Sequence, residues 1–148
     1  MAFRAAYWLM GVAVGATVLT VPANAKECYA PDARAQARAF SRVVTTEGGK
    51  TLYLAGHTSD PGLGFDQQVR DVFSQLDQNI KAAGGAGLPD MVTMTVFITD
   101  PRLGDRFIEL RKEAFKECFP ASALITITGL AQPGLLVEIQ GIALVGGK

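Results

Sequence analysis

Few side chains in this chain could do chemistry, and Glu138 is the first of them. It lies among Leu136, Ile139 and Ile142, where an ionised carboxylate is costly unless it is hydrogen-bonded. It could act as a general acid or base, or it could bond backbone donors in a purely structural role. His57 is the only histidine. It could serve as a pocket donor or general base, although a single histidine at a strand end is more often a surface or structurally bonded residue.

Sulfur chemistry is limited to Cys28 and Cys118. With one histidine and no Cys-x-x-Cys pair, the composition argues against a metal site, and we expect no cofactor. In an oxidising compartment the two cysteines could form a disulfide. Alternatively, Cys118 is a buried thiol at a helix end and Cys28 a loose terminal one. The sequence leaves this choice open.

The first half of the domain reads as two strands and a helix. Residues 40–45 and 51–56 are predicted to form a hairpin around a tight turn at 47–50, where a glycine pair supplies positive φ. Apolar residues then recur at steps of three and four from Phe65 to Ile80, which predicts a helix with one apolar stripe. The pair Gly84-Gly85 ends it.

The second half repeats the alternation of strand and helix. Residues 91–98 are rich in β-branched side chains and predict a strand. Asp100-Pro101 provides an N-cap and a first-turn proline for a second helix, which Phe119-Pro120 ends. Strands at 122–127 and 135–145 follow. The order ββαβαββ predicts a single α+β domain.

Strand alternation divides residues 122–127 between two faces. Ser122, Leu124 and Thr126 share one face, and the more apolar set Ala123, Ile125 and Ile127 shares the other. We therefore expect the second set to pack under the helices and Ser122 to lie on the opposite side of the sheet.

The last strand is apolar on both faces, although two helices can cover only one. One face carries Val137, Ile139 and Ala143, and the other carries Leu136, Ile142 and Leu144. An uncovered apolar face forgoes roughly 25 cal/mol per Å² of burial, and large patches of this kind rarely stay exposed. Self-association is the expected cover.

The first 25 residues read as an export signal. A short basic start is followed by an apolar stretch and by Ala23-Asn24-Ala25, which is typical of a cleavable signal peptide. The alternative is an uncleaved anchor, which needs about 20 apolar residues. We expect cleavage after Ala25, with residues 26–37 as an N-terminal extension, 38–148 as the domain, and a periplasmic or secreted product with no stable membrane insertion.

The charge of the processed chain is close to neutral. Cleavage removes one of the 14 basic residues and leaves 13 against 14 acidic ones, a net charge near −1. This balance gives no indication of a nucleic-acid partner.

Four segments together resemble the RidA (YjgF-type) family. They are Phe40–Val44, Leu52–His57, Asp90–Asp100 and the C-terminal stretch Pro120–Gln140, in family order over residues 38 to 146. The resemblance implies a chorismate mutase-like fold, with two helices on one face of a mixed sheet. It also implies a homotrimer whose sheets form a central barrel, with small-molecule pockets between subunits.

The resemblance also implies a site, and this chain departs from it at Ser122. Imine-hydrolysing members carry an arginine there, whose planar fork clamps the carboxylate of a 2-imino acid. A serine offers one neutral donor, which gives up about 1.5–3 kcal/mol. By the same comparison Phe40 lacks a tyrosine hydroxyl, Ile108 replaces an asparagine, and Glu138 is retained as the tentative catalytic residue.

The implied pocket comprises Phe40, Gly56, His57, Ile108, Ser122 and Leu124. Arg42 and Arg111 are the nearby arginines that could replace the lost clamp.

Three functions remain open on the sequence. The first is an exported RidA-like protein that binds a small apolar or neutral ligand between subunits, with weak or no imine deaminase activity. The second is a hydrolase, an enamine/imine deaminase that converts 2-iminobutanoate or 2-iminopropanoate to the 2-oxo acid and ammonia. The third is a structural or holdase-like trimer.

Overall fold

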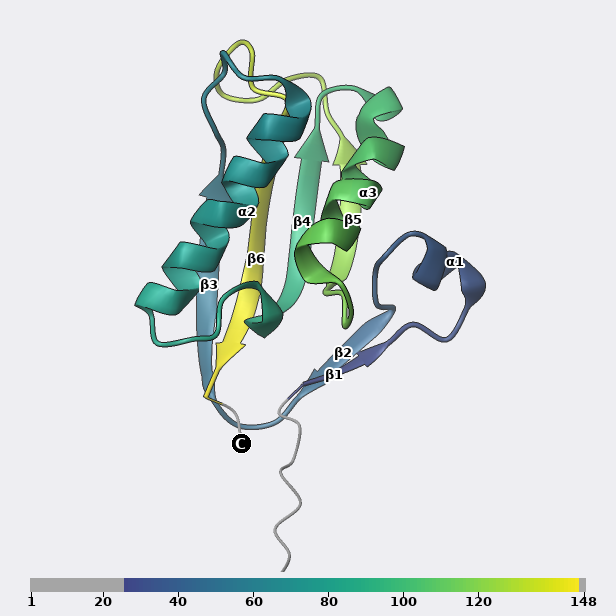
Figure 1. The fold of residues 1–148 in the computed structure, drawn as a ribbon, viewed down its shortest axis with the longest axis vertical. Helices are drawn as coiled ribbons and strands as arrows, with labels where there is room; N and C mark the ends of the chain where they lie inside the picture. The colour runs from purple at the N-terminus through teal and green to yellow at the C-terminus, as the bar shows by residue number, and fades with distance from the viewer. Residues whose placement is uncertain (1–25, 147–148) are drawn as a thin grey trace, which may run out of the picture.

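The computed structural model describes residues 26–146, and its centre is a four-stranded mixed sheet (Figure 1). The strands lie in the order β3-β6-β4-β5. Their bounds are Lys50–His57 for β3, Met91–Ile98 for β4, Ala121–Thr126 for β5 and Val137–Val145 for β6. Strands β4 and β5 run parallel, and β6 is antiparallel to both β3 and β4. The predicted segment from 1 to 25 lies outside the described residues.

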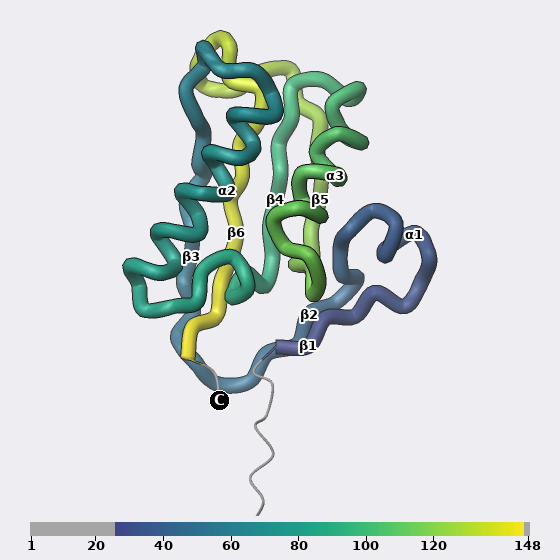
Figure 2. The backbone as a smooth tube through the Cα atoms, viewed as in Figure 1, coloured from purple at the N-terminus to yellow at the C-terminus, as the bar shows by residue number. Residues whose placement is uncertain are grey.

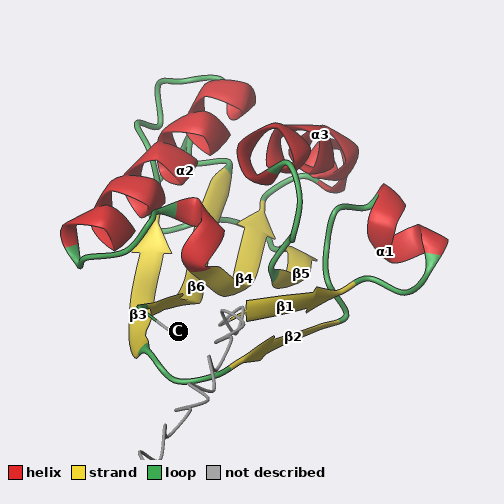
Figure 3. Cartoon of the chain, turned by 60° about the horizontal axis from the view of Figure 1, so that its bottom comes forward, coloured by secondary structure: helices red, strands yellow, loops and turns green. Residues whose placement is uncertain are grey.

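Both long helices cover the same face of this sheet, as predicted (Figures 1 and 3). Helix α2, Phe65–Ala82, buries one stripe that includes Val69, Val72, Leu76 and Ile80. It ends at the predicted place, because Gly84 takes a positive φ of 95° that favours glycine. No helix among residues 26–146 is long and apolar enough to cross a bilayer.

Helix α3, Gly104–Phe115, begins one turn later than its cap residue suggests. Asp100 accepts a hydrogen bond from the backbone N–H of Arg102 at 2.8 Å and so caps a short 3-10 turn, Pro101–Leu103, that leads into α3. A second 3-10 turn, Leu88–Asp90, precedes β4.

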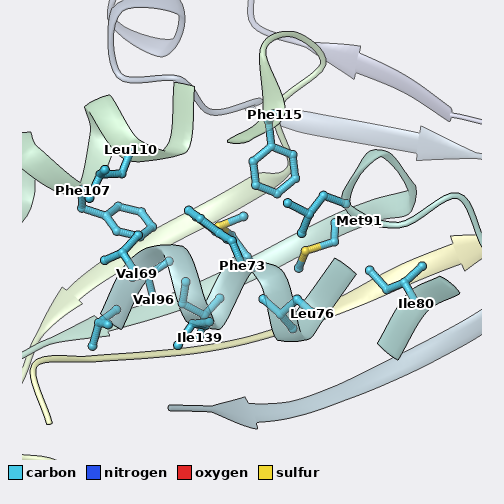
Figure 4. Close-up of a cluster of buried hydrophobic side chains, with 14 of the residues drawn as sticks. Val69, Phe73, Leu76, Ile80, Met91, Val96, Phe107, Leu110, Phe115 and Ile139 are labelled. Atoms are coloured by element: carbon cyan, nitrogen blue, oxygen red, sulfur yellow. The ribbon is translucent and has the colours of Figure 1, made fainter. Parts of the chain in front are cut away.

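The core lies between the helices and the sheet (Figure 4). The ring of Phe73 from α2 lies 5.9 Å from that of Phe107 and 5.6 Å from that of Phe115, both from the α3 segment. Met91 and Ile139 close the cluster from the sheet and are fully buried. This packing fixes α3 above β4 and β5, which positions the site described below.

The predicted hairpin between residues 40–45 and 51–56 is wrong. Residues Val43–Thr46 form β2, which pairs with β1, Lys26–Tyr29, in a separate two-stranded sheet. Strand β3 pairs with β6 instead. The glycine pair still makes a turn, with φ of 62° and 80°, but the chain passes from one sheet to the other there (Figure 2). The reason is that the N-terminal extension supplies β2 with a partner strand.

The extension is bonded covalently to the domain. Cys28 in β1 forms a disulfide with Cys118, between α3 and β5. Beside it, Ser41 donates its hydroxyl to the carbonyl of Phe119 at 2.5 Å and its backbone N–H to the carbonyl of Pro120 at 3.2 Å. These bonds hold the extension and its short helix α1, Ala33–Ala37, beside the edge strand β5 (Figure 1).

The two faces of β5 are reversed from the prediction. Ser122 and Leu124 pair with Met94 and Val96 of β4, which are buried in the core, so this set faces the helices. Ile125 lies on the other side and is 40% exposed. We call the side of the sheet opposite α2 and α3 the open face. Apolar content is a poor guide here, because the open face also carries apolar side chains.

Candidate functional site

A cavity of about 210 Å³ lies between α1, α3 and the edge strand β5. Three of the predicted pocket residues, Phe40, Ser122 and Leu124, line it. The remaining lining side chains are Arg34, Arg38 and Arg111. At about 30 Å³ per water molecule, the space corresponds to about seven waters. Three guanidinium groups around so small a space make the cavity strongly cationic.

Arg111 of α3 is the most unusual group in the cavity wall, because only 3% of it is exposed. Its Nη1 donates to the hydroxyl of Ser122 at 2.7 Å, and its Nη2 donates to the backbone carbonyl of Arg38 at 2.5 Å. Its Nε is buried without a hydrogen-bond partner among the described residues. The guanidinium also lies over the ring of Phe107, 5.3 Å from the centroid, a cation–π arrangement.

No carboxylate compensates this charge among residues 26–146. Arg111 forms no ion pair there, and none of the lining side chains is acidic. Burial, and secondly repulsion by Arg38, lowers the pKa of Arg111 to about 10. The side chain is therefore still cationic at neutral pH. A buried charge without a counter-charge costs several kcal/mol in general, and charges of this kind concentrate at functional sites.

Arg34 lies in α1 of the extension, Arg38 is the residue that ends this helix, and sequence reasoning missed both. Asp32 caps α1 by accepting the N–H of Ala35 at 2.8 Å, and the i, i+4 spacing of the two arginines places them on one side of this short helix. Arg38 also bonds the exposed carboxylate of Asp105 at 3.3 Å, a rim pair of a kind that contributes little. The signal that could have revealed them is the Pro31-Asp32 helix start followed by this spacing.

Arg42 does not line the cavity, although the sequence offered it beside Arg111. Its guanidinium stacks over the ring of Phe40, 5.3 Å from the centroid, and donates to Asp32 at 2.9 Å. The bond from Arg42 is the main cause that lowers the pKa of the Asp32 carboxyl. Arg42 thus connects Asp32 of the extension to Phe40, and Arg111 is the arginine beside Ser122.

The remaining predicted site residues lie elsewhere in the chain. Glu138 pairs with Phe97, which also pairs with Ile125, so Glu138 lies on the open face while Ser122 lies on the helix face. Glu138 is packed against Gly56, where an added Cβ would collide with its carboxylate. Within one chain the sheet therefore separates Ser122 from the retained glutamate.

His57 and Ile108 also stay outside the cavity. The Nδ1 of His57 lies 2.7 Å from the carbonyl of Ala55, and its Nε2 lies 2.7 Å from the side-chain nitrogen of Asn79. Since an amide nitrogen can only donate, Nε2 accepts and Nδ1 carries the proton. His57 is thus a structurally bonded residue in this chain. Ile108 is buried in α3.

The chemistry available in the cavity is anion binding by fixed guanidinium donors, with an aromatic and an aliphatic wall. A general base is missing from the lining residues. Among the described residues there is also no cluster of His, Cys, Asp and Glu that could hold a metal ion.

Comparison with known proteins places the chain in one family. The family model described as Endoribonuclease L-PSP matches residues 30–145. A RutC family protein from Pyrococcus horikoshii is 31% identical over 103 residues, which cover 66% of this chain and 81% of the relative. The human 2-iminobutanoate/2-iminopropanoate deaminase is 26% identical over 114 residues, covering 72% and 80%.

Solved structures agree with the fold. A member of the conserved Rid protein family from Yersinia pestis superposes with a TM-score of 0.71 at 22% identity, covering 82% of this chain and 99% of the other, which shows the fold alone. RidA from an Antarctic Psychrobacter superposes with a TM-score of 0.61 at 28% identity, covering 72% and 88%. With four sequence segments, a family model and the fold in agreement, the chain belongs to the RidA (YjgF-type) family.

Proposed function

We propose that this protein is an exported, small-molecule-binding member of the RidA family with weak or no imine deaminase activity. The observation that carries the proposal is the arrangement at Ser122. The strand position that carries the clamp arginine in imine-hydrolysing members here holds a hydroxyl that accepts a hydrogen bond from Arg111. The ligand-binding cation thus comes from a different element, α3, and approaches from a different direction.

The placement of Glu138 makes any imine hydrolysis depend on the assembly. Hydrolysis of an imine needs the carboxylate anchor and the residue that positions water on the same bound substrate, within about 3 Å of the reacting atoms. In this chain the cavity and Glu138 lie on opposite faces of the sheet. A catalytic glutamate would have to come from another subunit.

Export is supported by the disulfide. Bridges such as Cys28–Cys118 persist in oxidising compartments and are rare in the cytosol. We therefore place the processed protein, beginning at Lys26, in the periplasm or outside the cell.

Self-association as a homotrimer is part of the proposal, and the open face supports it. Tyr53 on this face is 83% exposed and Ile125 is 40% exposed. Ile142 and Leu144 of β6 are half-buried there, whereas Leu136 lies before β6 and packs against the core. Burial of this face between copies of the chain would remove the exposed apolar area from water.

A coupled assay tests the activity. An amino-acid oxidase generates 2-iminobutanoate, and semicarbazide traps the imine that remains. We expect the unmodified protein to leave the trapping rate close to that of a protein-free control. Efficient hydrolysis that is lost in Glu138→Ala would overturn the proposal and establish the deaminase, the function suggested by the name of the human relative.

The same assay can measure whether an arginine introduced at position 122 restores imine hydrolysis. Ser122→Arg alone places a second guanidinium against Arg111, because Ser122 Oγ and Arg111 Nη1 are 2.7 Å apart. Like charges at this range repel. We therefore expect Ser122→Arg combined with Arg111→Ser to recover more imine hydrolysis than Ser122→Arg alone. Arg102→Gln, at an 88% exposed side chain, is the matched control.

A further inference from the structure

The cationic cavity is built from two parts of the chain that lie far apart in sequence. Arg111 and Ser122 come from α3 and β5, while Arg34 comes from α1 of the extension and Arg38 directly follows that helix. The bond from Arg111 to the carbonyl of Arg38 joins the two halves, and the Cys28–Cys118 disulfide ties the extension to the segment just before β5.

We propose that this cavity binds a small anion with two negative charges, such as a phosphate group or a dicarboxylate, and that the N-terminal extension, together with Arg38 directly after it, forms half of the binding site. The inference rests on the proposed function, because it names the ligand class of the same pocket. It replaces the apolar or neutral ligand expected from the sequence.

The first argument is the unused donor capacity of Arg111. A guanidinium has five N–H donors in a planar fork, and two of them are used, by Ser122 and by Arg38. The side chain is nearly fully buried and has no acidic partner among the described residues. Since a buried cation needs compensation, an anion bound in the cavity supplies the missing charge and the missing acceptors.

The second argument is the charge of the ligand. A single carboxylate would balance Arg111 and leave the positive charges of Arg34 and Arg38 unmatched by any lining residue. Arg38 is partly neutralised by Asp105, whose side chain is 90% exposed, whereas Arg34 has no ion pair among residues 26–146. A dianion matches this distribution better than a monoanion does. The cavity volume of about 210 Å³ limits the ligand to a small molecule.

The third argument is that part of the cavity lining is apolar. Phe40 and Leu124 line the cavity together with the arginines, and Arg42 over the Phe40 ring holds that ring in place. The ligand therefore has a small apolar portion beside its anionic groups, as a phosphorylated or dicarboxylic metabolite of a few carbons does.

Titration calorimetry on the oxidised, processed protein tests the inference. The probes are inorganic phosphate and succinate as dianions, butanoate as a monoanion and butan-1-ol as a neutral compound. We expect the dianions to bind more tightly than butanoate, and butanoate more tightly than butan-1-ol. Arg111→Gln should weaken dianion binding by roughly tenfold or more, because charge-assisted hydrogen bonds are lost. Arg102→Gln should leave it unchanged.

A second set of variants tests the contribution of the segment around α1 to anion binding. Arg34→Gln with Arg38→Gln should weaken binding of phosphate or succinate by several-fold, and the charge-conserving pair Arg34→Lys with Arg38→Lys should restore part of it. Because these side chains are exposed or half-buried, the variants stay informative even if Arg111→Gln fails to fold. Cys28→Ser with Cys118→Ser should also weaken binding, since it removes the covalent link that holds the extension beside β5.

The two proposals fail separately. Equal affinity for butan-1-ol and the dianions, dianion affinity that does not change in Arg34→Gln with Arg38→Gln, or no dianion binding at all overturns the anion site. Each of these leaves a small-molecule pocket possible. Efficient imine hydrolysis by the unmodified protein overturns the proposed function instead, whatever the anion affinities are.

Discussion

Opening the Cys28–Cys118 bridge should destabilise the folded protein. The bridge links positions 90 residues apart. In the chain-entropy description, closing a loop of this length lowers the entropy of the unfolded chain enough to stabilise the fold by about 4.6 kcal/mol, while measured bridges typically contribute 2–4 kcal/mol. We expect the double variant Cys28→Ser with Cys118→Ser to lose about 2–4 kcal/mol of unfolding free energy.

The loss of unfolding free energy would lie at the lower end of this range if other contacts still hold the extension in place. The four residue pairs between β1 and β2 remain without the bridge. So does the ammonium of Lys26, which donates to the carbonyls of Pro89 and Met91 at 2.5 and 2.8 Å. If these contacts open locally before the domain unfolds, part of the loss appears as fraying of β1 and not as global instability.

Urea unfolding at one fixed protein concentration measures the effect, because self-association makes stability concentration-dependent. With a slope of about 2 kcal/mol per M, the middle of the usual range, a loss of about 2–4 kcal/mol lowers the midpoint by about 1–2 M. Dithiothreitol should shift the unmodified protein by the same amount and leave the double variant unchanged, since the chain has two cysteines. A midpoint that is the same with and without the bridge would refute the reasoning, provided hydrogen exchange at β1 is also unchanged.

Four further outcomes can be measured directly. Light scattering of the processed protein should report about three chains, and a well-folded monomer at micromolar concentration would contradict the homotrimer. N-terminal sequencing of native material should begin at Lys26, whereas an intact residue 1 would contradict export by cleavage. Gly141→Ala should destabilise the sheet by about 1–3 kcal/mol, because the added Cβ would collide with the carbonyl of Thr93, and an unchanged urea midpoint would show that β4 and β6 can move apart. Succinate, which stays a dianion over this range, should bind with constant affinity from pH 7 to 9 and more weakly above pH 10, since the pKa of Arg111 is about 10 and only the protonated form attracts an anion; a loss of affinity already between pH 7 and 9 would contradict this assignment.

The sequence predicts the two long helices and the order of the elements from residue 40 onward because local patterns determine them, whereas β1 and α1 are missed. The apolar stripe of α2 recurs at helical spacing over five turns, and its core residues are buried as expected. The cap at Asp100 and the glycine at 84 mark the element ends by local backbone chemistry. Such signals depend on neighbours in sequence, so a single chain is enough to read them.

The partner of β2 and the face of Ser122 depend on contacts that are remote in sequence. Strand β2 pairs with the extension, which a disulfide to residue 118 holds in place, and no local pattern records that pairing. The face of Ser122 was mispredicted because Ala123 and Ile125 are more apolar than their neighbours. Apolar content identifies the buried face only when the other face is meant for water, and here the proposed self-association would cover both.

The cation of the candidate site also depends on a contact between residues that are remote in sequence. Measured against the family pattern, the change at Ser122 looks like the loss of a cation. The structure shows that a cation is still present beside that position, because the guanidinium of Arg111 bonds the hydroxyl of Ser122. Two guanidinium groups at these neighbouring places would repel each other, and we therefore interpret Ser122 and Arg111 as a matched pair. The positive charge belongs to Arg111 of α3, whose Nη2 donates a hydrogen bond to the carbonyl of Arg38. Any ligand recognised by this guanidinium is therefore oriented by the segment around α1 as well as by the sheet, and a change at Arg34 or Arg38 should alter ligand selectivity even when α3 and the sheet are untouched.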